Sequence, residues 1–373
     1  MSKIQTKILY ALLTFPLWGL GGLGIESLSA QPPVGYYDAA FGKKKEELKT
    51  AMRGIVRNHT ARSYDNLWTD FQQTDKRPDG KVWDMYSDVP NGTASYYYTF
   101  SKNQCGNYGK EGDCYNREHS MPKSWFNDGT PMYTDLFHLY PTDGYVNGRR
   151  SNDPFGEVEA TTAKWTSSNG SKSGAGTAAS GYTGNVFEPR NEYKGDFART
   201  YFYMVTCYEN ELVNWTDAEA KPMLNATKYP SFTTWAINLL LKWSRNDKVS
   251  QKEIDRNNAV YEIQKNRNPF IDYPQLAEYI WGDSVMYAFD PNMPVSIDAT
   301  ADDENQPIVY VSSGVLHVAN ISEGSMIRIY DITGRQIFHL SNLPEVFTMP
   351  LPEKQLFIIK ITDKTGKTVV QRV

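Results

Sequence analysis

The sequence predicts an α+β protein, with a mostly helical domain built around a strand–strand–helix segment and a small C-terminal β-sandwich. Three observations predict this fold class. Apolar residues recur at helical spacing up to about residue 281. Short β-type runs separated by turn residues fill the end of the chain. An acidic, polar stretch typical of a linker lies between the two parts. We therefore divide the chain into residues 1–30, 31–290, 291–306 and 307–373.

Length and composition limit the class of protein. The chain has 373 residues, enough for one large core and a smaller second one. With 40% hydrophobic and 22% charged residues, it is expected to be globular and not disordered. The formal net charge of −4 gives no overall basic footprint. This counts against a protein that coats nucleic acid, but not against an enzyme with one locally basic cleft.

The N-terminus is typical of a targeting segment. Lys3 and Lys7 precede an apolar run that ends in small residues at Ala30. This pattern predicts a secretory signal peptide over residues 1–30, and hence a secreted protein. A membrane anchor is the alternative, but the run contains Pro16 and is short for a membrane span. No later segment is apolar enough to cross a bilayer.

Only three cysteines occur in the chain. Cys105 and Cys114 flank a Gly-rich loop and could close a small disulfide in an oxidising compartment. Cys207 lies in an apolar run and is expected to be a buried free thiol. A zinc site needs more ligands than this arrangement offers.

The helices are predicted from periodic apolar positions. In residues 43–59, Leu48, Met52 and Val56 trace one face, and the lysines are expected to form a solvated face. Residues 250–266 open with the capping box Ser-Gln-Lys-Glu. Further helices are expected at residues 64–70, 194–208, 229–243 and 274–281.

Aromatic or alternating runs predict strands at residues 82–86 and 95–100. The Ser/Gly/Ala-rich residues 165–184 are expected to form a surface loop or a hairpin connection. In the C-terminal part, strands are expected at residues 308–311, 315–319, 326–331, 336–339, 356–361 and 367–372.

The central stretch, residues 115–157, groups the side chains of chemical interest. Glu118 and His119 are expected to end an extended segment, because Met-Pro follows closely. Residues 135–140 resemble a second extended piece, and Pro141-Thr142-Asp143 is expected to start a helix that carries Asn147. This order predicts a strand, a loop, a strand and a helix.

These residue types suit the hydrolysis of a phosphodiester. A neutral imidazole at His119 could take a proton from water near pH 7. Glu118 and the amide oxygen of Asn147 are hard oxygen ligands of the kind that Mg²⁺ accepts. Arg149 and Arg150 could hold the phosphate by forked hydrogen bonds. Neighbours on a strand point to opposite sides, so Glu118 and His119 can serve together only if the strand ends or bends there.

Each feature also has an ordinary structural interpretation. A Glu-His pair is most often a surface pair, Asn-Gly is usually a turn, and an Arg-Arg pair is usually a solvated face. His138, between Phe137 and Leu139, is by itself expected to be a hydrogen-bonded core histidine.

The central motifs resemble a known family. The segments NREHSMPKSW and DLFHLYPTDGYVNGRRSNDPFGEV are similar to those of the bacterial endonuclease I family, secreted non-specific nucleases built on a His-metal (ββα) finger. Further similar segments are VFEP, KGDFARTYFYM, QKNRNPFIDYP and IWG, so the resemblance runs from about Tyr36 to Trp281. It implies that His119 is the general base and that Glu118 and Asn147 bind Mg²⁺ or a similar divalent ion such as Mn²⁺ or Ca²⁺. The implied products are 5′-phosphorylated fragments of DNA or RNA.

This chain departs from the family pattern in two ways. Phe137 stands where relatives often carry a first histidine, so His138 is expected to be a supporting residue. Some relatives have a phosphate-binding arginine between the base and the metal-binding asparagine, and here none lies between Arg117 and Arg149. We assign that role to Arg149 or Arg150. Asn152 and Arg199 are expected as supporting residues, with a structural role as the alternative for Arg199.

The C-terminal part carries a second resemblance. IRIYDITGRQIF and LFIIKITDKTGKTVVQRV are similar to the C-terminal sorting domain of the type IX secretion system of Bacteroidetes. The resemblance implies passage across the outer membrane, followed by release or surface attachment. A β-module that binds a carbohydrate or a protein partner is the alternative.

The sequence thus predicts a secreted, Mg²⁺-dependent, non-specific endonuclease that contacts DNA or RNA mainly through phosphates. A non-catalytic cell-surface binding protein with a degenerate nuclease site is the first alternative. A phosphodiesterase or phosphatase of small molecules is the second.

Overall fold

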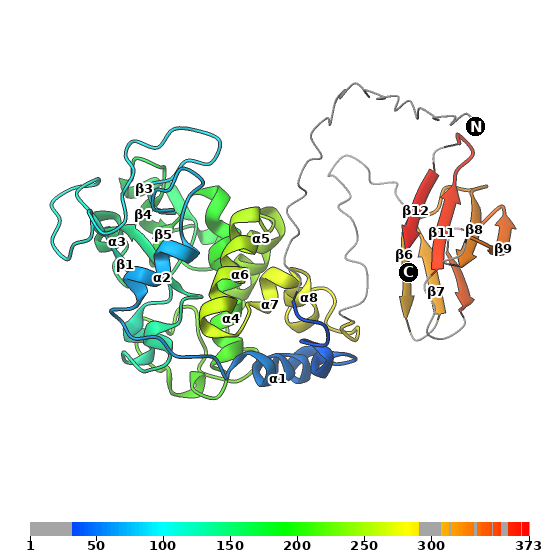
Figure 1. The fold of residues 1–373 in the computed structure, drawn as a ribbon, viewed down its shortest axis with the longest axis horizontal. Coiled ribbons are helices and arrows are strands. Elements are labelled where there is room, and N and C mark those ends of the chain that lie inside the picture. The colour runs from blue at the N-terminus through cyan, green and yellow to red at the C-terminus, as the bar shows by residue number, and fades with distance from the viewer. Residues whose placement is uncertain are drawn as a thin grey trace, which may run out of the picture.

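The computed structural model describes residues 32–290, 307–312, 315–331, 334–344, 346–351, 357–366 and 368–372 (Figure 1). The predicted signal peptide and the predicted linker lie outside these residues. Within the described parts of the chain, no helix has the length and apolar character that a membrane crossing needs.

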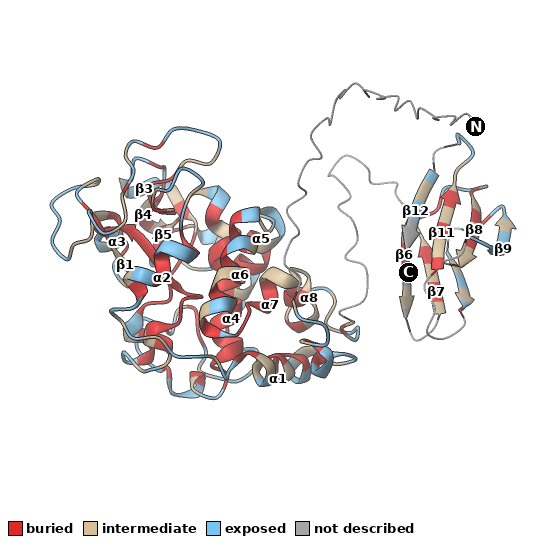
Figure 2. Ribbon diagram, viewed as in Figure 1, coloured by how far each residue is buried: buried red, intermediate tan, exposed pale blue. Residues whose placement is uncertain are grey.

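In residues 32–290, helices form most of the regular secondary structure, and the longest buried element is α4 (Lys194–Cys207). Every residue of α4 after Lys194 is buried (Figure 2). The other helices are α1 (Lys45–Val56), α2 (Leu67–Thr74), α3 (Gly144–Arg150), α5 (Thr234–Asn246), α6 (Gln251–Gln264), α7 (Pro269–Asp272) and α8 (Leu276–Ile280). α1, α5 and α7 pack against α4, and α2 packs against α6. One hydrophobic cluster joins these helices into a single core.

The predicted strand–strand–helix segment is present. β1 (Tyr115–His119) pairs antiparallel with β2 (Leu139–Asp143), and His119 lies opposite Leu139. α3 follows β2 without an intervening loop. β3 (Val158–Thr166), β4 (Lys172–Gly176) and β5 (Asn185–Glu188) form a separate three-stranded antiparallel sheet. The Ser/Gly/Ala-rich residues 165–184, expected to form a surface loop or a hairpin connection, instead contain the end of β3 and the whole of β4.

α3 begins where the side chain of Asp143 caps it. One carboxylate oxygen of Asp143 accepts the backbone N–H of Val146 at 2.8 Å, as an N-cap residue does. The other oxygen accepts the hydroxyl of Tyr98 at 2.6 Å and the backbone N–H of Gly112 at 2.8 Å. The cap thus ties the start of α3 to the loop before β1.

That loop is closed by the disulfide Cys105–Cys114, which the sequence predicts as a possibility. Its Tyr108 ring lies directly against α3, and a Cβ at Gly144 or Gly148 would come within 2.6 or 2.5 Å of Tyr108 atoms. Glycine at these two positions therefore lets the loop pack onto the helix.

The helices lie at the predicted positions, but three other predictions are corrected by the structure. Lys49 is not part of a solvated face, because its ammonium is buried and lies 3.2 Å from Glu209 Oε1. Residues 82–86 and 95–100 form no strand in the described chain, and only one backbone hydrogen bond, from Val82 N to Tyr98 O, joins them. Pro141 and Thr142, expected to start the α3 helix, instead lie in β2, whereas Asp143 ends β2 and caps α3.

The C-terminal part is a β-sandwich, which confirms the predicted fold class. The first sheet is formed by β6 (Ile308–Ser312), β7 (Val315–Ala319) and β10 (Phe347–Pro350). The second is formed by β8 (Met326–Asp331), β9 (Gln336–Ser341), β11 (Phe357–Thr362) and β12 (Thr368–Arg372). Apolar residues of both sheets, such as Leu316 and Ile359, form one core. In this part of the chain, β10 is a strand that the sequence analysis missed, as it also missed β3, β4 and β5 in the N-terminal part.

Candidate active site

Side chains alternate across β1, and the two faces of the strand have different neighbours. Asn116 and Glu118 point toward α3, where each contacts an α3 side chain. Arg117 and His119 point the other way, where the Arg117 guanidinium and the His119 imidazole both pack on the Tyr64 ring. β1 ends at His119, which is the condition that the sequence analysis set for the Glu-His pair to act together.

Glu118 is a buried carboxylate held by two donors. Its Oε1 accepts the hydroxyl of Tyr86 at 2.8 Å and Nη1 of Arg150 at 3.0 Å. Burial raises the pKa of Glu118, while the positive charge of Arg150 and the hydrogen bond from Tyr86 act in the opposite direction. Both donors use Oε1, so neither of them occupies Oε2.

Arg150 is buried and does not lie where a phosphate could reach it. Besides Glu118, its guanidinium donates to the backbone carbonyls of His119 at 3.0 Å and Ser120 at 2.6 Å. The predicted phosphate-binding role of Arg150 therefore does not fit its position. Its donors instead fix the Glu118 carboxylate and the end of β1.

Asn147 lies on α3 opposite β1 and is partly exposed. Its Nδ2 donates to Oδ1 of Asn116 at 2.8 Å. Because this bond uses the amide nitrogen, the amide oxygen of Asn147 faces elsewhere and remains an acceptor. Glu118 and Asn147 thus offer two hard oxygen ligands from β1 and α3, the donor set that a hard divalent cation takes.

His119 is enclosed by aromatic rings. Its Nε2 lies 3.0 Å from the carbonyl oxygen of Tyr133, so Nε2 carries the proton and Nδ1 carries the lone pair. The Tyr133 ring stacks on the imidazole at 5.0 Å and the Tyr64 ring at 6.1 Å. Burial, with the nearby His138, lowers the pKa of His119 to about 3. The ring is therefore neutral at ordinary pH, as a general base requires.

His138 lies behind His119 and is fully buried. Its Nε2 is 2.6 Å from the carbonyl oxygen of Met132, and its ring centre is 5.5 Å from that of His119. Burial lowers the pKa of His138. This position combines both expectations, since His138 is a hydrogen-bonded core histidine and also packs against the candidate base.

The other predicted residues lie in different surroundings. Arg149 is exposed on α3, with its guanidinium 4.9 Å from the Tyr145 ring and 6.0 Å from the Trp165 ring. Asn152 lines a cavity of about 300 Å³ together with Tyr182 and Asn185. Neither residue has a described contact with Glu118 or His119.

Arg199 is structural. Its Nε and Nη2 donate to the two carboxylate oxygens of Glu253 at 2.6 and 2.8 Å, and the pair is buried between α4 and α6. Glu253 is also the N3 residue of the predicted capping box, which is present. The bidentate pair therefore joins two helices and leaves no donor edge of Arg199 for the site.

Sequence reasoning missed four residues of this site: Tyr86, Asn116, Arg117 and Tyr133. The period-2 alternation of β1 could have found Asn116 and Arg117, because it places them on the faces of Glu118 and His119. Tyr86 lies in a loop 32 residues before Glu118, and Tyr133 lies in a 3-10 helix 14 residues after His119; nothing in their local pattern marks them.

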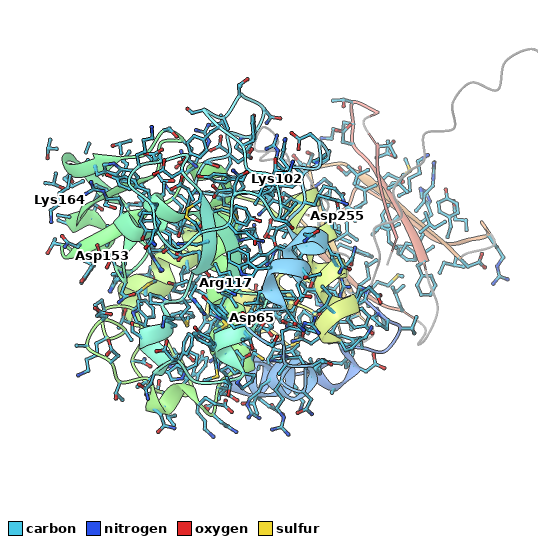
Figure 3. All side chains as sticks on the ribbon, turned by 60° about the vertical axis from the view of Figure 1, so that its left-hand side comes forward. Asp65, Lys102, Arg117, Asp153, Lys164 and Asp255 are labelled. Carbon is cyan, nitrogen blue, oxygen red and sulfur yellow. A yellow bond between two sulfur atoms is a disulfide. The ribbon has the colours of Figure 1, made fainter. Side chains whose placement is uncertain are left out.

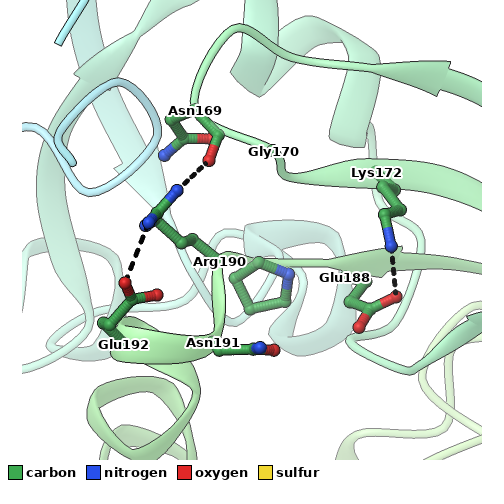
Figure 4. A pocket seen from close by; sticks show the side chains of 8 residues that line it. Asn169, Gly170, Lys172, Glu188, Arg190, Asn191 and Glu192 are labelled. Atoms are coloured by element: carbon green, nitrogen blue, oxygen red, sulfur yellow. Dashed lines mark hydrogen bonds and ion pairs between the residues drawn. The ribbon is translucent and has the colours of Figure 1, made fainter.

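A cavity on the surface of the three-stranded sheet contains none of these residues. Its volume is about 310 Å³, and it lies between β4, β5 and the turn after β5 (Figure 4). Lys172 pairs with Glu188 at 3.9 Å, and Arg190 pairs with Glu192 at 2.9 Å while donating to the Asn169 carbonyl at 2.8 Å. Its charges thus neutralise one another, so the cavity offers no free group for chemistry.

A second cluster of metal-ligand types lies in the core. His59, Asp135 and Cys207 have ligand atoms within 4.8 Å of one another, the one such group in the described parts of the chain. Burial raises the pKa of the Cys207 thiol, which keeps it protonated. Asp135 already accepts four hydrogen bonds, from the hydroxyls of Tyr203 and Tyr208, Nε2 of Gln264 and the backbone N–H of Phe137. A cation would find neither a thiolate nor an unused carboxylate lone pair here, so Glu118 and Asn147 are the better donor set.

Known proteins are similar in sequence to part of this chain. The extracellular ribonuclease of Bacillus amyloliquefaciens is 36% identical over 249 residues, which cover 66% of this chain and 78% of that protein. The extracellular ribonuclease of Bacillus subtilis is 34% identical, also over 249 residues that cover 66% of this chain and 78% of that protein. Endonuclease-1 of Buchnera aphidicola is 28% identical over 138 residues, 37% of this chain and 46% of that protein.

A solved immunoglobulin-like β-sandwich from Bacteroides vulgatus is similar at 19% identity and a TM-score of 0.18, covering 19% of this chain and 85% of that one. The model of the family described as Endonuclease I matches residues 44–275, which hold the whole of β1, β2 and α3. The chain belongs to the Endonuclease I family and is a nuclease enzyme.

Proposed function

We propose that this protein is a secreted, divalent-metal-dependent endonuclease that hydrolyses phosphodiester bonds of DNA or RNA. The arrangement of β1 and α3 carries the proposal: a neutral His119 with a free Nδ1 at the strand end, beside Glu118 and Asn147 as oxygen ligands. The family implies a nucleic acid substrate and suggests a divalent metal. Relatives named extracellular ribonucleases suggest secretion.

The donor set fits a hard cation. Glu118 supplies a carboxylate, Asn147 supplies an amide oxygen that Asn116 orients, and no thiolate or second imidazole is needed. Mg²⁺ suits such a site, because it takes few protein ligands and keeps several waters. When bound, the cation supplies positive charge that stabilises the phosphoryl oxygens and the leaving oxygen.

The residues of the chain divide the remaining work. Nδ1 of His119 takes one proton from water, whose oxygen forms a bond to phosphorus while the P–O3′ bond breaks. The leaving 3′-oxygen takes one proton from a solvent water, and His119 returns its proton to solvent. The 5′ fragment keeps a 3′-hydroxyl, and the phosphate stays on the 5′ end of the other fragment. The Tyr133 carbonyl holds the Nε2 proton and so keeps the imidazole in the reactive tautomer.

Arg150 acts as a positioning residue. Its guanidinium holds the Glu118 carboxylate and the carbonyls at the end of β1, so it acts through other residues. Arg149 is exposed and can contact a phosphate further along the bound strand. His138 supports the His119 ring from behind, and the buried contacts of Arg199 with Glu253 fit a structural role.

The test uses the mature protein on supercoiled plasmid and on a long RNA, with Mg²⁺, Mn²⁺ or Ca²⁺, or with EDTA. We expect nicking and then fragmentation that requires a cation and is lost in Glu118→Gln and in His119→Ala. Isothermal titration of the cation separates the two variants, since only Glu118→Gln should weaken cation binding. Plasmid and RNA left intact with every cation would contradict the proposal. Fragment ends are checked by ligation, which needs a 5′-phosphate.

For the ends of the chain we propose that residues 1–30 are a signal peptide, 291–306 a linker and 307–373 a type IX sorting domain. The separate hydrophobic core of the C-terminal sandwich supports a module of its own. The test is expression in a bacterium that has this secretion system, with and without residues 307–373. We expect the full-length protein outside the cell and the truncated protein retained. Equal export of both would contradict the sorting role, and a carbohydrate-binding or partner-binding module would then be the better interpretation.

A further inference from the structure

We propose that Arg117 binds a phosphate of the nucleic acid beside the scissile bond, on the same face of β1 as His119. The inference rests on the proposed nuclease function and names one group that holds its substrate. It replaces Arg150, whose guanidinium is enclosed by Glu118 and two carbonyls.

The plane of the Arg117 guanidinium is fixed by its neighbours. It lies 3.5 Å from the centre of the Tyr64 ring and 4.4 Å from that of Trp68. Its Nη1 donates to the backbone carbonyl of Tyr64 at 2.7 Å. A cation packed over two aromatic rings and hydrogen-bonded to a carbonyl is ordered before any ligand arrives, so little rotamer freedom is lost when it binds one.

The guanidinium still has donors to offer. In the described parts of the chain, its one hydrogen bond to a backbone carbonyl uses Nη1, and the Tyr64 side chain also interacts with the guanidinium. Asp65 lies 3.9 Å from the same nitrogen, but its side chain is 98% exposed, so this ion pair is weak (Figure 3). Nε and Nη2 therefore remain as an edge of two donors, the fork that matches two phosphate oxygens.

A chain of packed rings connects this cation to the base. The Tyr64 ring packs on that of Tyr133 at 4.7 Å, and Tyr133 stacks on His119 at 5.0 Å. Arg117 and His119 are also two residues apart on one strand, so both stand on the same side of β1. The position of the phosphate-binding edge is thereby set relative to Nδ1 of the base.

Two other cations fit less well. Lys123 lies 5.5 Å from the Tyr133 ring, but its ammonium is 2.8 Å from Asp128 and carries no fork. Arg149 packs on Tyr145 and Trp165, and within residues 32–290 no ring contact joins these two to Tyr64 or Tyr133. Arg117 is thus the arginine that shares an environment with His119.

The test measures binding apart from cleavage. In a His119→Ala background with Ca²⁺, the affinity for a 20-base-pair duplex is followed by fluorescence anisotropy at several KCl concentrations. Arg117→Gln should weaken binding several-fold and reduce the slope of log affinity against log salt by about 0.9, the value for one lost phosphate contact. Arg117→Lys should restore most of the slope but not the full affinity, because lysine has no fork.

Arg245→Gln serves as the matched control, because this substitution removes the same charge. Arg245 is an exposed arginine of α5 that pairs with Glu278. It should leave the salt slope unchanged. In the His119-containing enzyme, Arg117→Gln should lower kcat/KM at least tenfold with an unchanged melting temperature.

An unchanged salt slope in Arg117→Gln, or a loss explained by a lowered melting temperature that Arg117→Lys does not share, would overturn the assignment. The outcome is distinguishable from failure of the proposed function. If the unaltered protein cleaves plasmid but Arg117→Gln binds as tightly as its parent, only the role of Arg117 is wrong. If the unaltered protein cleaves nothing, the proposed function itself fails.

Discussion

Arg150 and Glu118 form a buried ion pair between α3 and β1, with Nη1 3.0 Å from Oε1. Removing one partner of such a pair leaves the other charge buried and unpaired, which costs about 3–5 kcal/mol. We expect Arg150→Met to lower the free energy of unfolding by this order, measured by urea denaturation in EDTA. Arg149→Met is the control, because the neighbouring arginine is exposed and its replacement should change stability by at most about 0.5 kcal/mol. Equal effects of the two substitutions would contradict this role of Arg150.

Asn116 is predicted to set cation affinity without binding the cation. Its Oδ1 accepts Nδ2 of Asn147 at 2.8 Å and so aims the amide oxygen of Asn147. Loss of a residue that orients a metal ligand typically lowers affinity about 10- to 100-fold. We expect this loss in Asn116→Leu by isothermal titration with Mn²⁺. Asn116→Asp keeps an acceptor for Asn147 and should retain the affinity. A similar loss in both variants would show that the amide orientation is not the cause.

His119 should make stability fall in acid. Its pKa is lowered to about 3 in the folded protein, below the ordinary value of 6.5, because the ring is buried. Between these values the unfolded chain binds a proton that the folded chain does not, so the contribution is complete above pH 6.5 and is lost as the pH falls. At pH 5 this amounts to about 2 kcal/mol.

The measurement compares urea unfolding at pH 7.5 and pH 5, in EDTA, for the unaltered protein and His119→Gln. The buried His138 is common to both proteins, so its contribution cancels in the difference. The variant should lose less stability on acidification. Parallel losses would mean that the folded imidazole titrates normally.

The disulfide is predicted to stiffen α3. A bond that closes a loop with a sequence separation of 9 stabilises a fold by about 2.5 kcal/mol in the chain-entropy description. Cys105→Ser with Cys114→Ser should lower the free energy of unfolding by this order and speed hydrogen exchange of α3 amides. Gly148→Ala should also speed exchange with the disulfide intact, because the added methyl would meet Tyr108. Unchanged exchange in both variants would contradict the packing role of the loop.

Arg199→Met should affect the fold and not the site. Its bidentate contact with Glu253 joins α4 and α6, so we expect a loss of about 3–5 kcal/mol of stability. Cation affinity and kcat, measured well below the melting temperature, should stay within about twofold of the unaltered protein. A selective loss of kcat would return Arg199 to the site.

The sequence predicts the elements that carry their own periodicity. The helices around Leu48 and after Ser250, and the strand ending at His119, follow from local spacing and capping. The false strands at residues 82–86 and 95–100 show the limit of that reasoning. Their aromatic residues are used by long-range contacts, such as Tyr86 with Glu118 and Tyr98 with Asp143, which no local pattern records.

For the candidate site, the sequence indicates the residue types more reliably than the role of each residue. Glu118 and His119 end β1, and Asn147 lies on α3, which packs against β1, while their chemical roles stay proposals. Neighbouring residues on a helix point about 100° apart, so Arg149 and Arg150 face different parts of the structure. Which of the two faces inward depends on the buried Glu118 opposite, and sequence alone does not show that contact.

The alternation of β1 makes its pairing with β2 critical for chemistry. A slip of one residue would turn His119 toward α3 and Glu118 toward Tyr64, exchanging the proposed base and the proposed cation ligand. Arg150 opposes such a slip, because it grips the carbonyls of His119 and Ser120 at 3.0 and 2.6 Å. The strand is therefore intolerant of a single inserted or deleted residue, even where its composition is kept. Arg150 thus helps to fix the register of β1, a role in which its hydrogen bonds to the backbone matter as much as its charge.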